Sequence, residues 1–113
     1  MKLRMRGNSV RLRLTRSEVA QFAETGLVEE AVIFPSSTLN YALRCNPSQG
    51  VTANLVAGQL TVVVPPAVAR KWTDTEEIGI SAHSSGLDIL IEKDFQCAHG
   101  PADSDAFPPE RLS

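Results

Sequence analysis

The chain has 113 residues, of which 42% are hydrophobic and 21% are charged, and its formal net charge is −2 at pH 7. This length fits a single domain, because cores of about 100 to 150 residues are the commonest size. The sequence contains no apolar run of about 18 residues that could cross a membrane, and no apolar stretch of the signal-peptide kind follows its basic N-terminus. We therefore expect a cytoplasmic protein without membrane partners.

Charge is distributed unevenly along the chain. The first sixteen residues contain six of the eleven basic residues and no acidic residue. Residues 96–113, in contrast, are acidic and contain three prolines, a composition typical of a flexible tail. We expect a basic N-terminal segment that could bind DNA, and an acidic tail that could bind a protein partner.

Residues 2–14 show the pattern of a β-hairpin. In RGNSVRLRL, residues 6–14, Gly7-Asn8 is expected to form a two-residue turn, and basic and apolar side chains alternate in the strand that follows it. Thr15 and Glu18 then form a capping box, which predicts the start of a helix, and Gly26 is placed to end it. A second hairpin is expected at residues 28–34 and 39–44.

The same pattern recurs 50 residues later. Leu12 aligns with Val62, Leu14 with Val64 and Phe22 with Trp72. Pro65-Pro66 marks the start of the second helix, and a last hairpin is expected at residues 78–82 and 87–92. Such internal repetition indicates two structural units of the same kind.

We predict a β-rich α+β fold made of a duplicated ββαββ unit with two short helices. The first copy occupies about residues 2–45 and the second about residues 51–94, within one domain at residues 1–95. Neither copy has enough apolar surface to fold alone, so the copies are expected to share a core around a pseudo-twofold axis. Phe22 and Trp72 should meet near that axis.

Two stretches resemble a known family. Residues 4–34, RMRGNSVRLRLTRSEVAQFAETGLVEEAVIF, resemble the N-terminal domain of MazE-type antitoxins and the wider AbrB-like family, chiefly at Gly7-Asn8-Ser9, the alternating run and the short helix. Residues 60–80, LTVVVPPAVARKWTDTEEIGI, resemble the same unit. The resemblance implies a swapped-hairpin barrel and a DNA-binding or antitoxin-type regulator. It also implies either a homodimer or a monomer whose single chain supplies both halves.

In that family the first strand is a basic arm that touches DNA, and Arg4, Asn8 and Arg13 match its contacting positions. Arginine can neutralise phosphates and bind guanine edges, and a β-ribbon fits the major groove. The nucleic-acid-binding candidates are Arg4, Arg6, Asn8, Ser9, Arg11 and Arg13.

Two departures from the family pattern weigh against DNA binding. Arg6 stands where that family often has an aromatic residue, and the second copy replaces the basic arm with VTANLV at residues 51–56. The arginines could instead form a solvated outer face that protects an exposed strand edge. In that case Glu29, Glu30, Glu76 or Glu77 could pair with them across strands.

A second resemblance covers nearly the whole chain. GNSVRLRLT at residues 7–15, EKDF at residues 92–95 and DAFP at residues 105–108 resemble a family of small bacterial proteins of unassigned function. This resemblance implies no activity. It leaves open a protein-interaction module on the same fold, with DNA binding lost, as the alternative function.

Catalysis and cofactors are not expected. The sequence contains no nucleophile elbow, P-loop, dinucleotide fingerprint or paired-histidine motif. Cys97 and His99 are metal-ligand types, but their spacing matches no structural zinc site, so they are only weak candidates and no metal is predicted.

Overall fold

The computed structural model describes residues 1–94. The predicted acidic tail at residues 96–113, with the weak metal candidates Cys97 and His99, lies outside the described residues. Within residues 1–94 no group of three or more potential metal-ligating side chains is found, and no helix is both long and apolar enough to cross a membrane.

The elements follow the order ββαββ twice, as the repeat predicts. Those of the first half are β1 (Lys2–Arg6), β2 (Ser9–Leu14), α1 (Arg16–Thr25), β3 (Leu27–Ile33) and β4 (Thr38–Cys45). Those of the second half are β5 (Thr52–Val56), β6 (Gln59–Val64), α2 (Pro66–Asp74), β7 (Gly79–Ser84) and β8 (Leu87–Lys93). The prediction of a β-rich α+β fold with two short helices is therefore confirmed.

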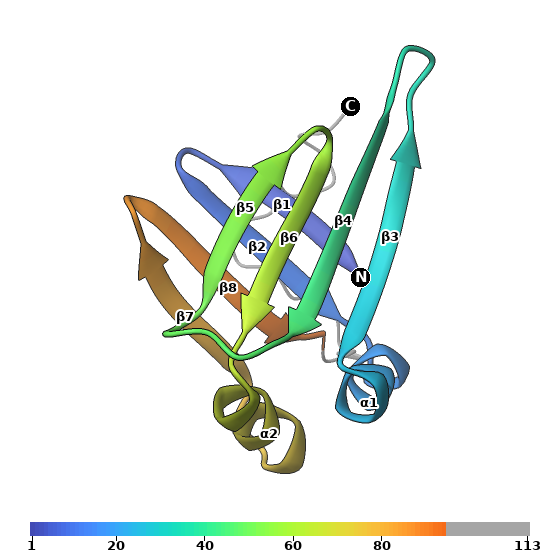
Figure 1. The fold of residues 1–113 in the computed structure, drawn as a ribbon. Coiled ribbons are helices and arrows are strands. Elements are labelled where there is room, and N and C mark those ends of the chain that lie inside the picture. Colours follow the sequence, from blue (N-terminus) through green and yellow to red (C-terminus); the bar gives the residue numbers. More distant parts are fainter. Residues whose placement is uncertain (95–113) are drawn as a thin grey trace, which may run out of the picture.

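The strands form two four-stranded sheets, and each sheet combines one hairpin from each half of the chain (Figure 1). The order is β1-β2-β8-β7 in the first sheet and β3-β4-β6-β5 in the second. The halves join through two parallel pairs, β2 with β8 and β4 with β6, whereas all other neighbours are antiparallel. Both helices lie at the same end of the sheets (Figure 1).

Within residues 1–94 the two sheets are not closed into a barrel, and this corrects one part of the predicted fold. The first sheet ends at β1 and β7, and the second ends at β3 and β5. A barrel requires every strand to have a hydrogen-bonded neighbour on both sides, so these four edge strands leave an open two-sheet arrangement.

Local signals place the helix ends where the sequence predicts them. Thr15 is the N-cap of α1, and its capping box with Glu18 is complete. Gly26 ends α1 in the left-handed conformation, with φ of 75°, and its N–H donates to the Phe22 carbonyl at 2.8 Å. Pro66 lies in the first turn of α2, where its missing N–H leaves no helical bond unmade.

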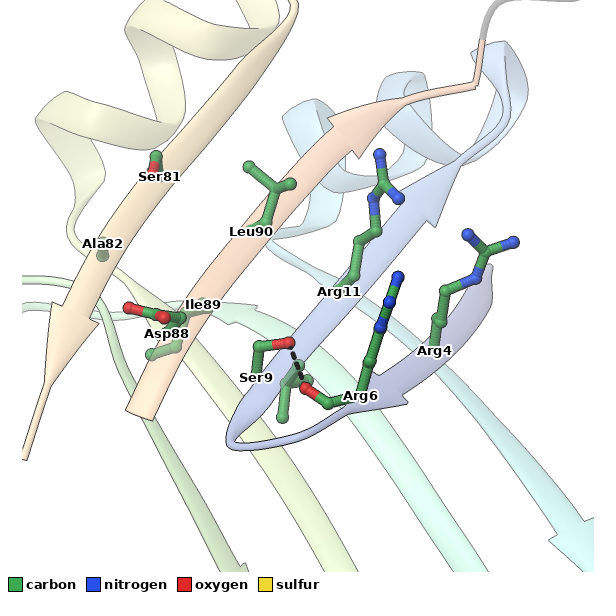
Figure 2. Close-up of a pocket in the computed structure, with 10 residues that line it drawn as sticks. Arg4, Arg6, Ser9, Arg11, Ser81, Ala82, Asp88, Ile89 and Leu90 are labelled. Atoms are coloured by element: carbon green, nitrogen blue, oxygen red, sulfur yellow. Dashed lines mark hydrogen bonds between the residues drawn. The ribbon is translucent and has the colours of Figure 1, made fainter. Parts of the chain in front are cut away.

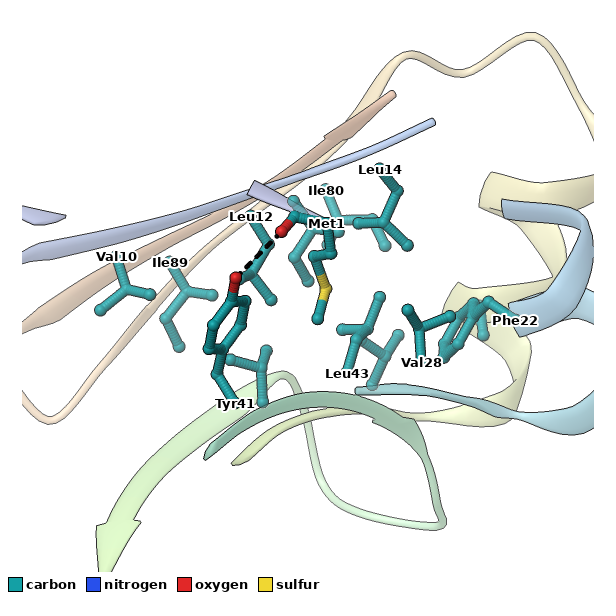
Figure 3. Close-up of a cluster of buried hydrophobic side chains, with 14 of the residues drawn as sticks. Met1, Val10, Leu12, Leu14, Phe22, Val28, Tyr41, Leu43, Ile80 and Ile89 are labelled. Carbon is teal, nitrogen blue, oxygen red and sulfur yellow. Dashed lines mark hydrogen bonds between the residues drawn. The ribbon is translucent and has the colours of Figure 1, made fainter. Parts of the chain in front are cut away.

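The core fills the space between the sheets and extends to the helices (Figure 3). The inward positions of β2 and β6 are matched in the two halves and buried, namely Val10, Leu12 and Leu14 in β2 and Leu60, Val62 and Val64 in β6. Phe22 and Trp72 meet edge to face, with ring centroids 6.1 Å apart and an interplanar angle of 67°. The Trp72 indole N–H also donates to the Ile78 carbonyl at 3.1 Å, so its polar atom is satisfied.

Met1 connects the start of β1 to the second sheet and to α1. Its side chain lies in the core, and the Tyr41 hydroxyl donates to its carbonyl at 3.1 Å (Figure 3). Its amino group donates to the carboxylates of Glu18 and Glu30. Burial disfavours the ammonium, but the hydrogen bonds to these carboxylates and their negative charges outweigh it and raise the pKa of the amino group above its usual value.

Candidate nucleic-acid interface

The basic residues of the N-terminal segment gather on the outer face of the first sheet. The outward positions of β1 and β2 hold Lys2, Arg4 and Arg6, then Ser9, Arg11 and Arg13. Alternation explains this arrangement, because Val10, Leu12 and Leu14 point into the core and their neighbours must point outward. Figure 2 shows Arg4, Arg6 and Arg11 on the same side of these two strands.

The strand register places cations directly opposite one another. Arg4 pairs with Arg11 across β1 and β2, and Lys2 pairs with Arg13. Like charges in directly opposite positions destabilise a sheet by a few tenths to about 1 kcal/mol per pair. An anionic group placed beside such a pair offsets that cost.

Carboxylates of β8 and of the residue after it offset part of this charge. Arg11 binds Glu92 through Nε at 2.9 Å and through a terminal guanidinium nitrogen at 2.8 Å. Arg13 lies 3.8 Å from Glu92 and 4.0 Å from Asp94, and Lys2 lies 3.5 Å from Asp94. Two of the acidic residues that the sequence suggested as partners of the arginines bind other groups. Glu30 binds the Met1 amino group, and Glu77 lies 3.8 Å from Lys71.

Arg4 and Arg6 are both exposed. Arg4 is exposed and makes no hydrogen bond or ion pair with any residue in the described part of the chain. Arg6 is also exposed, and its carbonyl accepts a hydrogen bond from the Ser9 hydroxyl at 2.7 Å (Figure 2). Arg4, Arg6 and Arg11 border a shallow depression of about 350 Å³, which Ser9, Asp88 and Leu90 also line.

Asn8 is hydrogen-bonded to the last hairpin of the chain. Its side-chain amide donates to the Gly86 carbonyl, and its backbone carbonyl accepts from the Asp88 N–H at 3.0 Å. The first hairpin turn is thereby tied to the last one, between β7 and β8. The side-chain amide of Asn8 is therefore engaged with the protein backbone through one hydrogen bond, although the residue is exposed.

Three acidic residues of this face were missed by reasoning from sequence. Glu92 and Asp94 lie about 80 positions from Arg11 and Arg13, which they approach, and Asp88 lies opposite Ser9. The parallel β2–β8 pair brings all three to this face. A short-range pattern holds no signal for that pairing. His83 is exposed, and its Nδ1 lies 2.7 Å from Asp88 Oδ1.

The repeat makes the charge asymmetry clear. The positions of β5 and β6 that correspond to the basic positions of β1 and β2 are all uncharged: Thr52, Asn54, Val56, Thr61 and Val63. The inward residues of the two hairpins, in contrast, match like with like. Packing of the inward residues therefore does not require the cations.

Comparison with known proteins gives one match. Residues 1–110 match the family of unknown function DUF7009. Neither the curated proteins nor the solved structures provide a match. The chain, with its duplicated unit and a cationic outer face on one copy only, belongs to the DUF7009 family.

Proposed function

We propose that the protein is a non-catalytic DNA-binding regulator that holds the phosphate backbone against the outer face of β1 and β2. The proposal extends to the MazE/AbrB-like relationship that the N-terminal residues suggest, with a swapped-hairpin arrangement and a location in the cytoplasm. The observation that carries it is the confinement of cations to one of two otherwise matched hairpins.

The carboxylates on this face are compatible with DNA binding. Arg11 and Arg13 are half-buried, so solvent screens their pairs with Glu92 only in part. Phosphate oxygens can replace Glu92 and Asp94 as partners because they accept the same charge-assisted hydrogen bonds from a guanidinium group. Arg4 has no carboxylate partner among the described residues, so a phosphate can bind its guanidinium group without displacing one of them.

Salt-dependent binding tests the proposal. Duplex DNA from the region upstream of the protein's own gene is titrated with the full chain by fluorescence anisotropy at several salt concentrations. Counterion release predicts that the logarithm of the binding constant falls with the logarithm of salt, by about 0.9 for each phosphate neutralised. Arg4→Ala should make that slope shallower by about one unit and should not lower the unfolding midpoint, because it removes one charge of the Arg4–Arg11 pair.

Arg44→Ala is the matched control, because Arg44 is an exposed cation on the outer face of the second sheet. It removes the same charge and should leave both affinity and slope unchanged. Binding no tighter than about 10⁻⁴ M at physiological salt would contradict the proposal. So would equal losses in the two variants, since these would reflect net charge alone.

A specific observation favours a second candidate, a protein-interaction module. The tip of the β3–β4 hairpin exposes two large apolar side chains, Ile33 at 81% and Phe34 at 51% of their surface. Exposed apolar groups at a projecting tip are typical of a contact with another protein. If the wild-type chain does not bind DNA in the titration, the protein-interaction module becomes the favoured function.

A further inference from the structure

We infer that β5 is a homodimer interface, at which the β5 strands of two copies pair antiparallel and join their second sheets into one continuous sheet. This inference goes beyond DNA binding and does not depend on it. It rests on how the four edge strands differ.

An exposed strand edge has unpaired N–H and C=O groups, and proteins protect it with charges or by covering it. Of the edge strands, β1 contains Lys2, Arg4 and Arg6, and β3 contains Glu29 and Glu30. The large apolar side chain of β7, Ile80, is buried, and His83 near its end lies against Asp88. These three edges are protected or offer little apolar surface.

Within residues 1–94, the edge at β5 has no protecting charge, and β7 contacts only part of it. Its sequence TANLV contains no charged residue, and Leu55 and Val56 are 63% and 68% exposed. Its counterpart in the repeat, β1, has Arg4 and Arg6 at the positions of Asn54 and Val56. The same fold therefore accepts cations at this edge, and their absence from β5 is a difference that edge protection does not explain.

The hairpin geometry determines which groups of β5 face outward. Val56 and Gln59 flank a two-residue turn, and such a flanking pair is hydrogen-bonded in an antiparallel hairpin. Because hydrogen-bonded pairs alternate along the ladder, Asn54 also bonds to β6, and the N–H and C=O groups of Ala53 and Leu55 point to the open edge.

These outward groups favour one register between two copies. Pairing Ala53 of each copy with Leu55 of the other satisfies all four outward groups of each strand and centres the pair on Asn54. The large Leu55 then faces the small Ala53 on one side of the sheet, and Val56 faces Thr52 on the other. No two like charges meet, whereas the same pairing of β1 with itself would bring Lys2 against Arg6.

The first test is the mass of the full chain in solution. Sedimentation across a wide concentration series should show a species of twice 12.2 kDa that dissociates on dilution. We expect weak association, because the contact is limited to one five-residue strand from each copy, whereas stable specific interfaces bury more than about 1,000 Å². A monomer at every concentration would overturn the inference.

Charge at the edge provides the second test. Asn54→Arg with Val56→Arg copies the arrangement of β1 onto β5 and should give a monomer with an unchanged far-ultraviolet circular dichroism spectrum. Ser81→Arg with His83→Arg adds charge to the edge strand β7 and should leave the dimer intact. A dimer that survives the β5 substitutions, or one that is lost equally in both double variants, would refute the interface.

A cross-link tests the register itself. Asn54 of each copy forms a non-hydrogen-bonded pair, with Cα atoms about 4.5 Å apart, which is within the range that a disulfide spans. Asn54→Cys should therefore form a covalent dimer when dissolved oxygen oxidises the two thiols. Arg4→Cys, at the matching position of β1, is the control and should not. Equal cross-linking of the two variants would contradict pairing through β5.

Discussion

The amino group of Met1 links the first strand to the rest of the fold through Glu18 and Glu30. Burial opposes the charged form of Glu18, but the Met1 ammonium and the Thr15 N–H bind it and lower its pKa below the usual value. The pKa of the Met1 amino group is raised. The ion pair thus has both partners charged over a broad range of pH.

A stability maximum at intermediate pH follows. The Met1 amino group contributes fully to the free energy of unfolding at a pH below its unfolded pKa of about 8, and this contribution is lost as pH rises through its higher folded pKa. Glu18 contributes fully at a pH above its unfolded pKa of about 4.3, and this contribution is lost as pH falls through its lower folded pKa. Urea unfolding across pH should show both losses.

Glu18→Gln isolates the alkaline loss. Gln keeps an oxygen that can accept from the Thr15 N–H, so the capping box is preserved while the negative charge is removed. The decline of stability above pH of about 8 should become shallower, though Glu30 still pairs with the amine. An unchanged alkaline decline would show that this ion pair does not determine it.

Among the elements, the hairpin turns show where glycine is required. Gly58 has φ of 79°, and a Cβ built on it would lie 3.0 Å from the Thr38 carbonyl oxygen. Gly7 has φ of 56° but open space within 4 Å. Both alanine variants meet left-handed backbone strain of about 1 to 2 kcal/mol.

Gly58→Ala should therefore destabilise more than Gly7→Ala. The additional cost arises because the Gly58 carbonyl accepts the Asn40 N–H at 2.8 Å, so the turn cannot move from β4 without losing that bond. Denaturant midpoints of the two variants measure the difference. Equal midpoints would indicate that the turn relaxes freely away from Thr38.

For the whole molecule, the parallel pairs β2–β8 and β4–β6 make each half depend on the other. Fragments 1–48 and 49–113 should each lack cooperative unfolding, because neither can form a four-stranded sheet from its own strands. Mixing them should restore a β-type circular dichroism spectrum and a cooperative transition. Cooperative unfolding of one fragment alone would contradict this dependence.

Sequence alone determined the elements, because their signals are local. Alternation predicted the hairpins, the Thr15–Glu18 box and Gly26 predicted the limits of α1, and the repeat predicted the meeting of Phe22 with Trp72. The predicted strand at residues 28–34 differs by one position from the observed β3 at Leu27–Ile33.

Only the tertiary structure decided how the two halves combine and what surrounds the basic residues. The contact of Asn8 with Gly86 joins residues 78 positions apart, and that of Arg11 with Glu92 joins residues 81 apart. The open arrangement of two sheets was likewise not apparent from sequence. The physical reason is that strand pairing between distant segments depends on the free energy of the whole core, whereas turns, caps and alternation depend on neighbouring residues.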